Sequence, residues 1–232
     1  MDKLISKYKH IIWDWNGTLL DDVSVAINVM NSVLNKRNLP LITLEYYKDI
    51  FGFPVIDYYK RLGFDFSQEP FELISQEFII AYDNCCYYCR LHTGAEAVLN
   101  AVMEAGISQS ILSAAHQDHL ERFIEYFNIR HYFVKLIGLN HIHATSKVEN
   151  GVKWISSLPC NPMEVLLIGD TSHDYEVSKA IGCDCILLAS GHHSAEKLKT
   201  FNVPVYNSLH DLIPLCTIPA YHISNYSTNL TS

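Results

Sequence analysis

The sequence lacks a long hydrophobic run, an apolar segment near its N-terminus and a surplus of basic residues. No apolar run approaches the roughly 20 residues that a membrane-spanning helix needs, so we expect no membrane contact. Residues 1–9 carry charges and contain no apolar signal core, and we therefore expect a cytoplasmic protein. The 17 basic residues are outnumbered by 25 acidic ones, and the net charge of −8 argues against a nucleic-acid partner.

The number of cysteines is odd, seven, which argues against a disulfide framework and suits a reducing compartment. Two groups are close in sequence: Cys85, Cys86 and Cys89, and Cys183 with Cys185. A zinc site is one interpretation of this spacing. However, the first group follows a helical pattern and the second alternates along an expected strand, so we favour buried free thiols.

The apolar patterns divide the chain of 232 residues into two kinds of segment. Between residues 22 and 91 apolar residues recur at helical spacing, and no strand-like alternation appears. From residue 93 onward helical patterns alternate with short apolar runs, beginning with a capping box at Thr93–Glu96. Alternation of this kind predicts an α/β fold with a parallel sheet.

We therefore expect a sheet-containing core into which a helical segment is inserted. Residues 217–232 are mostly Ser, Thr, Asn and Tyr, which is typical of a flexible tail. The expected units are the core at 1–21 and 92–216, the all-helical insertion at 22–91 and the tail at 217–232.

One short segment carries the strongest chemical signal. The apolar run Ile11–Trp13 predicts a buried parallel strand, and the strand ends abruptly at the carboxylate of Asp14. The turn dipeptide Asn16-Gly17 follows, and then the hydroxyl of Thr18. Open α/β sheets bind ligands at the carboxyl ends of their strands. The backbone amides of Gly17 and Thr18 are therefore positioned to bind an anion.

Three later segments place polar residues at comparable points. Ser113 follows an expected strand, and Lys147 begins an expected helix, where a cation and free amides suit a phosphoryl group. Each of these two alone is more often a turn or surface residue. Asp170 and Asp174 follow the apolar run Val165–Ile168, and such paired carboxylates suit Mg²⁺. Asp174 has the simpler alternative role of capping the next helix.

In this order the motifs resemble those of the haloacid dehalogenase-like phosphohydrolases. Asp14-Trp15-Asn16-Gly17-Thr18-Leu19 is similar to the family's first motif, Asp-x-Asp-Gly-Thr, and Gly169-Asp170 with Asp174 is similar to its fourth. Ser113 and Lys147 match the second and third motifs less specifically. The resemblance implies a Rossmann-like core with a helical cap inserted after the first motif. The subgroup of phosphoglycolate phosphatase and β-phosphoglucomutase is the most similar.

The resemblance also implies a role for each residue. Asp14 would be the nucleophile that attacks phosphorus and becomes an aspartyl phosphate, and Thr18 would orient the loop. Ser113 and Lys147 would hold the phosphoryl group, with Gly17 and Ala114 beside it. The Mg²⁺ ligands would be Asp14, the backbone carbonyl of Asn16, and Asp170, with Asp174 in support.

Asn16 departs from the family pattern, which has a second aspartate as general acid and base at this position. An amide supplies no such proton, and general acid–base catalysis contributes about 10²–10⁴-fold. We expect the loss to matter most for alkyl phosphates and least for aryl phosphates. His116 and His173 are the nearest candidates for a replacement, although each is more often a structural residue. His141-x-His143 and His192-His193 are open to either a surface or a substrate-side role.

The leading hypothesis is a Mg²⁺-dependent phosphomonoester hydrolase for a small phosphorylated metabolite, acting as a monomer or homodimer. The alternative is a catalytically weakened relative that binds a phosphorylated ligand or a protein partner, and Asn16 favours it. A haloacid dehalogenase is a third option. It needs no metal, so the two aspartates of the fourth motif count against it. A phosphomutase is less favoured because it relies on an acid/base at position 16.

Overall fold

The computed structural model describes residues 7–139 and 147–216. The predicted flexible tail lies outside the described residues. Six parallel strands form one sheet in the order β5-β4-β1-β6-β7-β8. The strands are β1 (His10–Trp13), β4 (Ser108–His116), β5 (Lys135–Leu139), β6 (Val165–Gly169), β7 (Asp184–Leu188) and β8 (Val205–Tyr206). The fold is therefore α/β with a Rossmann-like core, as the alternating patterns predict.

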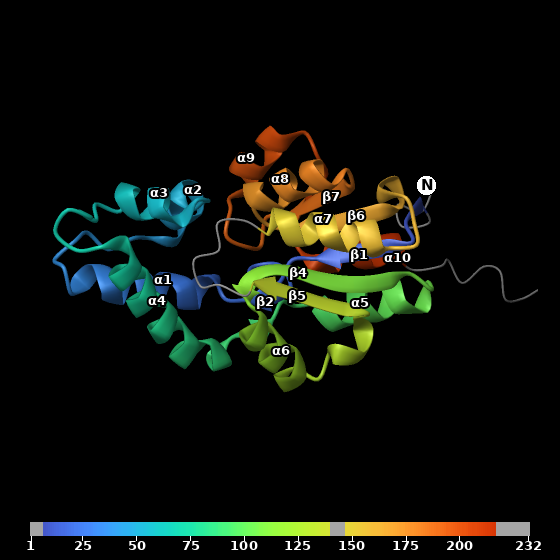
Figure 1. The fold of residues 1–232 in the computed structure, drawn as a ribbon, viewed down its shortest axis with the longest axis horizontal. Coiled ribbons are helices and arrows are strands. Elements are labelled where there is room, and N and C mark those ends of the chain that lie inside the picture. Colours follow the sequence, from blue (N-terminus) through green and yellow to red (C-terminus); the bar gives the residue numbers. More distant parts are fainter. Residues whose placement is uncertain (1–6, 140–146, 217–232) are drawn as a thin grey trace, which may run out of the picture.

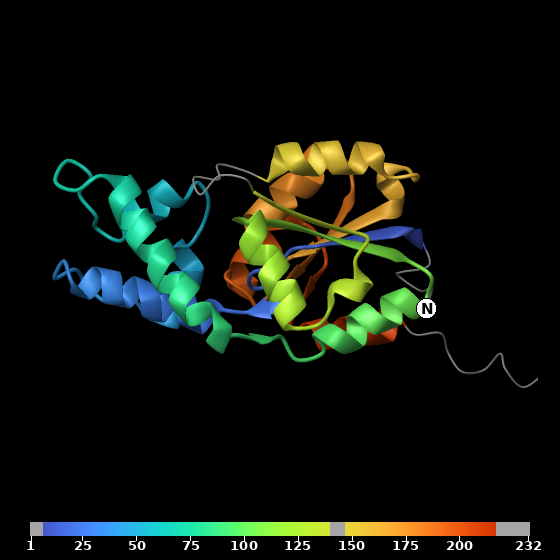
Figure 2. The ribbon, with the colours of Figure 1, turned by 60° about the horizontal axis from the view of Figure 1, so that its bottom comes forward.

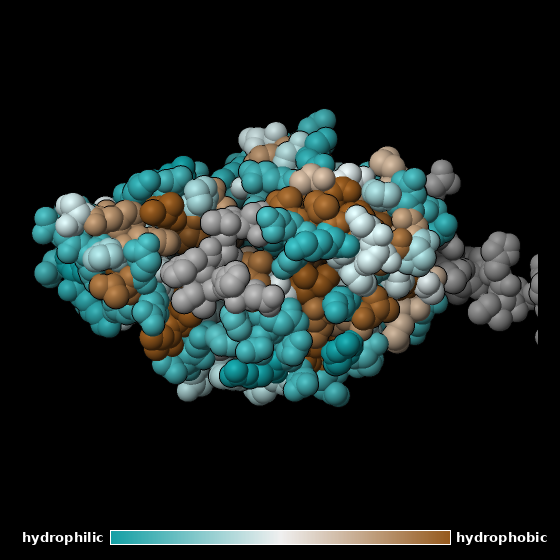
Figure 3. Space-filling view, in the orientation of Figure 1, coloured by the Kyte–Doolittle hydropathy of each residue, from teal (hydrophilic) through white to brown (hydrophobic). Residues whose placement is uncertain are grey.

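Helices cover both faces of this sheet (Figure 2). They are α5 (Ala95–Glu104), α6 (Gln117–Tyr126), α7 (Val148–Ser157), α8 (Ser172–Ile181), α9 (Ala195–Leu198) and α10 (Ile213–Cys216). Side chains alternate along β1, so that Ile11 and Trp13 pack toward α5 and α6 while Ile12 packs toward α7 and α8. All three are fully buried, and each contributes about 1.5–3 kcal/mol of stability. Figure 3 shows hydrophilic residues on the outer face of α6, consistent with an apolar inner face.

A separate group of helices extends from one end of the sheet (Figure 1). These are α1 (Val23–Asn35), α2 (Leu44–Ile50), α3 (Val55–Arg61) and α4 (Phe71–Cys85), and they enclose their own hydrophobic core. The chain enters this group through β2 (Leu20–Asp21) and leaves it through β3 (Arg90–Leu91), which pair antiparallel. We call the four helices the cap. We keep residues 22 and 91 as the proposed boundaries of the cap, and both lie next to this two-stranded ribbon.

Two predictions from local sequence patterns in the core were wrong, namely the capping box at Thr93 and the end of the strand before Ser113. Gly94, in the left-handed conformation (φ +89°), precedes α5 and no side chain caps the helix, so the predicted capping box at Thr93 is absent. Strand β4 continues beyond Leu112 to His116, which pairs with Leu139 of β5. Ser113 therefore lies within the strand rather than after it.

Cys85, Cys160, Cys183, Cys185 and Cys216 are free thiols, and Cys183 and Cys185 are buried as predicted. Cys85 is half-buried. Among the described residues the one cluster of three possible metal ligands consists of aspartates and contains no thiol. No helix in the described part of the chain has the length and apolar character to cross a membrane.

Candidate active site

Three aspartates meet at the carboxyl end of the sheet. Asp14 follows β1 and its backbone N–H donates to the carbonyl of Ile168 at 2.9 Å, which places it beside the end of β6. Asp170 follows β6 directly, and Asp174 lies in the first turn of α8. Carboxylate oxygens of the three residues lie within 4.8 Å of one another, and all three residues are buried. Two motifs separated by more than 150 residues thus form one cluster.

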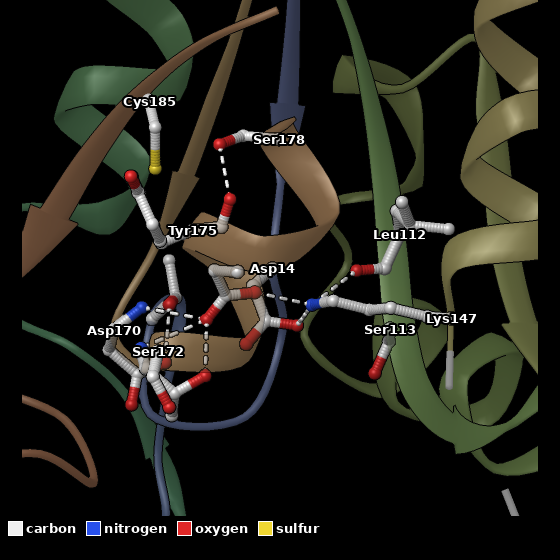
Figure 4. Close-up of polar contacts among 12 residues, drawn as sticks. Asp14, Leu112, Ser113, Lys147, Asp170, Ser172, Tyr175, Ser178 and Cys185 are labelled. Carbon is white, nitrogen blue, oxygen red and sulfur yellow. Dashed lines mark hydrogen bonds and ion pairs between the residues drawn. The ribbon is translucent and has the colours of Figure 1, made fainter. Parts of the chain in front are cut away.

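Lys147 holds two of these carboxylates together. Its Nζ donates to Asp14 Oδ1 at 2.6 Å, to Asp174 Oδ1 at 2.5 Å and to the carbonyl of Leu112 at 3.2 Å (Figure 4). Lys147 precedes α7 and is only 2% exposed. Burial opposes its charge, but Asp14 and Asp174 outweigh burial and raise its pKa above the usual value. The side chain is therefore a fixed cation beside the expected nucleophile.

Asp174 is fully engaged by hydrogen bonds. Its Oδ2 accepts from the backbone N–H of Asp170 at 3.1 Å, from the N–H of Thr171 at 3.0 Å and from Thr171 Oγ1 at 2.8 Å. Its other oxygen accepts from Lys147. This carboxylate caps α8 and orients Lys147, which combines its two predicted roles of helix cap and support for the site.

Asp170 is fixed by the loop after β1 and by the loop after β7. Thr18 Oγ1 donates to its Oδ1 at 2.8 Å, and the backbone N–H of His192 donates to its Oδ2 at 2.6 Å. Gly17 has φ +74°, and a Cβ atom there would clash with the carboxylate of Asp170. The Gly17-Thr18 turn therefore packs directly on Asp170.

Asn16 belongs to a buried network that the sequence did not reveal. Its Nδ2 donates to Asp22 Oδ2 at 2.9 Å and to the hydroxyl oxygen of Tyr82 at 3.0 Å. Asp22 also accepts from Tyr82 at 2.6 Å, from the N–H of Gly17 at 2.8 Å and from His192 Nε2 at 3.2 Å.

The charges in this network are complementary. Burial opposes ionisation of both partners, but the ion pair prevails: it raises the pKa of His192 to about 9 and lowers the pKa of Asp22 below its usual value. Tyr47 of the cap adds a hydrogen bond of 2.8 Å to His192 Nδ1. The only sequence signal for this network was the position of Asp22 at the start of the first cap helix. Nothing local pointed to His192, which lies 170 residues later.

The remaining predicted residues line one cavity of about 490 Å³ between the sheet and the cap. Ser113 is buried, and its Oγ accepts from the N–H of Ala115 at 3.0 Å. Ala114 lies beside it in the cavity wall. His116 and His173 also line the cavity, and His173 stacks on Phe53 with ring centroids 4.5 Å apart. His141 and His143 lie outside the described residues.

Negative charge exceeds positive charge in this buried centre. Four carboxylates, of Asp14, Asp22, Asp170 and Asp174, face the two cations of Lys147 and His192. Burial, together with Asp174, raises the pKa of Asp14 well above its ordinary value, and burial raises the pKa of Asp170 to about 6. A buried cluster of hard oxygen ligands with surplus negative charge is suited to a divalent cation.

Comparison with known proteins agrees with this geometry. The sequence profile of the haloacid dehalogenase-like hydrolases matches residues 11–188. A phosphoglycolate phosphatase from Haemophilus influenzae is 23% identical over 218 residues, which cover 90% of this chain and 94% of that protein. Tyrosine-protein kinase PtkA from Mycobacterium bovis is 24% identical over 193 residues, which cover 80% of this chain and 64% of that protein. A solved haloacid dehalogenase-like hydrolase from Streptococcus pneumoniae superposes with a TM-score of 0.78 at 16% identity, covering 91% of this chain and 100% of that one. The chain belongs to the haloacid dehalogenase-like hydrolase family.

Proposed function

We propose that this protein is a Mg²⁺-dependent phosphomonoester hydrolase that acts through an aspartyl phosphate on Asp14. The observation that carries the proposal is the position of Lys147 between Asp14 and Asp174, beside Asp170 and open to the cavity. A carboxylate held by a buried cation in this way is a directed nucleophile rather than a structural turn residue. We further expect a small phosphorylated metabolite as substrate, a cytoplasmic location and a monomer or homodimer.

The residues account for both halves of the reaction. In the first half an oxygen of Asp14 forms a bond to phosphorus while the bond from phosphorus to the leaving-group oxygen breaks. In the second half the oxygen of a water molecule forms a bond to phosphorus while the bond from phosphorus to the Asp14 oxygen breaks. Inorganic phosphate leaves with the protons of the water, and the Asp14 carboxylate is restored. Lys147 offsets the negative charge that would otherwise repel a phosphoryl dianion. Ser113 Oγ would donate a hydrogen bond to a phosphoryl oxygen. The amides of Gly17 and Thr18, which the sequence suggested as anion ligands, are already engaged, because the N–H of Gly17 donates to Asp22 Oδ1 at 2.8 Å and the N–H of Thr18 donates to the carbonyl of Trp15 at 3.3 Å.

The donor set fits Mg²⁺. Asp14, Asp170 and the backbone carbonyl of Asn16 would hold the ion, and when bound it would neutralise charge on the phosphoryl oxygens. Asp174 would act mainly by orienting Lys147, because its Oδ2 already accepts three hydrogen bonds and its Oδ1 accepts one from Lys147. Each oxygen of Asp170 accepts a single hydrogen bond and so keeps a lone pair for the ion. The surplus of buried negative charge supports this assignment.

Asn16 determines where proton transfer limits the rate. Its amide has no carboxylic proton for a departing alkoxide and no basic site for the attacking water. The proposal therefore predicts slow hydrolysis of the aspartyl phosphate and a strong preference for leaving groups that depart as stable anions. Two relatives with different activities, a phosphoglycolate phosphatase and a tyrosine-protein kinase, have nearly equal identity to this chain, so the substrate is argued from the site.

A time course of 4-nitrophenyl phosphate cleavage at stoichiometric enzyme concentration tests this proposal. Steady release that requires Mg²⁺ and is lost in Asp14→Asn would support a phosphatase. A burst that stops near one product per enzyme would support Asp14 as the nucleophile and identify dephosphorylation as the blocked step. Absence of release, with or without Mg²⁺, would contradict the proposal.

The second candidate is a catalytically weakened protein that binds a phosphorylated ligand or a partner. The engagement of the Asn16 amide with Asp22 and Tyr82 favours it, because it fixes a residue without acid function at the position of the acid. Tight binding of inorganic phosphate by titration calorimetry, without product release in the time course, would favour this candidate over the phosphatase.

A further inference from the structure

The cavity above Asp14 has a wall of aromatic side chains from the cap. Its residues come from α3, from α4 and from the α2–α3 loop, and they are Phe51, Phe53, Tyr58, Tyr59, Phe71 and Phe78. Their rings pack on one another, with Phe51 5.3 Å from Tyr58 and Tyr59 5.4 Å from Phe71. A wall built in this way presents flat apolar surfaces to whatever is attached to the phosphoryl group.

The core holds this wall in place over the site. His193 Nε2 and Lys197 Nζ lie 2.9 and 2.7 Å from the carbonyl oxygen of Phe51, and Lys48 Nζ of α2 donates to the carbonyl of Ala189 at 3.2 Å. Helix α2 lies next to the core in Figure 1, in agreement with these contacts. The aromatic wall and Asp14 therefore border the same cavity.

The two cations among the described residues that line the cavity, Lys147 and His192, already face carboxylates and are not available to a second anionic group, since His192 Nε2 lies 3.2 Å from Asp22 Oδ1. Among the described residues that line it, Lys147 is the only lysine or arginine, and it is already bound to Asp14 and Asp174. The cap side adds the carboxylates of Glu72 and Asp83. The histidine His119 lies 3.1 Å from Asp83, so a carboxylate already faces it. A carboxylate on the substrate would thus meet apolar rings and like charges.

The polar atom that the wall does provide is neutral. The hydroxyl of Tyr58 is buried and has no hydrogen-bond partner in the described part of the chain. A buried polar atom is normally satisfied by a hydrogen bond. The hydroxyl of Tyr58 is neutral, so this residue adds no charge that would bind a second anionic group.

We propose that the substrate is an aryl phosphate whose ring bears no second anionic group, an inference that rests on the proposed phosphatase function. The aromatic wall favours a substrate with an aromatic ring, and Asn16 favours a leaving group that needs no proton. When the bond from Asp14 to phosphorus forms, the bond to the aryl oxygen breaks and its electron pair leaves on a phenolate. A phenol has an ordinary pKa of about 10, far below that of an alkyl alcohol, so a phenolate departs without a proton from position 16.

A matched set of esters tests the proposal on the intact protein with Mg²⁺. We expect kcat/KM for phenyl phosphate to exceed that for phosphoglycolate or glycerol 2-phosphate at least 100-fold. To separate the pocket from leaving-group reactivity, 4-carbamoylphenyl and 4-carboxyphenyl phosphate are compared, because they have similar shape and differ in charge. We expect the neutral amide to be favoured at least tenfold, mainly through KM.

Two lysine variants on α4 provide the matched control. Ile79 lines the cavity, whereas its neighbour Ile80 is 55% exposed and lies outside the cavity wall. Ile79→Lys should reduce the preference for the amide ester at least fivefold, and Ile80→Lys should leave the preference unchanged. Equal turnover of the two phenyl esters by the wild type, or phosphoglycolate turnover above that of phenyl phosphate, would overturn the aryl proposal and leave the phosphatase intact. If none of the esters is cleaved, the phosphatase proposal is overturned, and the substrate proposal with it.

Discussion

Exchange of Asn16 for aspartate tests the buried network directly. The Asn16 amide nitrogen lies 2.9 Å from Asp22 Oδ2, so Asn16→Asp replaces a donor by a second carboxylate at that distance. At an effective dielectric constant of about 20, two unit charges 2.9 Å apart repel by about 6 kcal/mol, equivalent to about four pKa units. The cation of His192 reduces this repulsion. We therefore expect the new carboxyl at position 16 to have a pKa of about 7–8.

The sign of the resulting pH dependence follows from proton binding. The new carboxyl has a pKa of about 3.9 in the unfolded chain and a higher one in the folded chain, so the folded state binds more protons between these values. The unfolding free energy of Asn16→Asp should therefore fall, relative to the wild type, by about 3–4 kcal/mol between pH 5 and pH 8. Urea denaturation followed by tryptophan fluorescence at pH 5, 6, 7 and 8 measures this difference.

The exchanged pair Asn16→Asp/Asp22→Asn is the matched control, because it has the same composition and net charge as the wild type. It restores one amide and one carboxylate in contact, so the repulsion, and with it the fall in stability between pH 5 and pH 8 relative to the wild type, should disappear. The exchange also removes the carboxylate of Asp22 from His192, and loss of that ion pair lowers the stability of the double variant. A pH-independent stability loss in the single variant would refute the contact between positions 16 and 22.

The same single variant tests the account of proton supply. A carboxyl that is protonated near pH 7 is a suitable general acid, so Asn16→Asp should raise hydrolysis of glycerol 2-phosphate by about 10²-fold or more. Hydrolysis of 4-nitrophenyl phosphate should rise less, because its leaving group needs little acid. If alkyl phosphate hydrolysis stays unchanged, another group supplies the proton and the assignment of the defect to Asn16 is wrong.

Three further predictions concern the buried charges. Lys147→Met should lower the unfolding free energy by about 3–5 kcal/mol and abolish turnover, because it leaves Asp14 and Asp174 without their cation; unchanged stability in urea would contradict the ion-pair geometry. Burial lowers the pKa of His10 to about 4, so the unfolded state takes up a proton at this residue before the folded state does. This should remove about 3 kcal/mol of stability as pH falls from 6.5 to 4. The His10→Gln variant should lose less over this range, and stability profiles against pH that run parallel in variant and wild type would refute the lowered pKa of His10. Removal of divalent ions with EDTA should abolish turnover. Mg²⁺ at 100 times its Kd should raise the unfolding free energy of the wild type by about 2.7 kcal/mol but should leave that of Asp170→Asn unchanged. An equal rise in both proteins would mean that the ion binds at another site.

The core of the fold could be predicted because its strands are encoded locally. The runs at Ile11–Trp13 and Val165–Ile168 are apolar throughout and end at a carboxylate, so both the strand and its functional end are visible in the sequence. The end of β4 was not visible, because the pairing of His116 with Leu139 extends the strand through residues that have no apolar pattern. Similarly, Gly94 determines the start of α5 through its backbone conformation rather than through a capping side chain.

The network around Asn16 could not be predicted, because it joins residues that are distant in the chain and are not part of a local pattern. In the sequence, Asn16 is recognised only because the family motif has an aspartate at this position. In the structure its amide meets Asp22, which also accepts hydrogen bonds from Gly17, Tyr82 and His192. A carboxylate at position 16 would have to share that space with the carboxylate of Asp22, whereas an amide donates to it. An amide at position 16 is therefore the residue type that complements Asp22, and it leaves the contacts among Asp14, Lys147 and Asp174 in place.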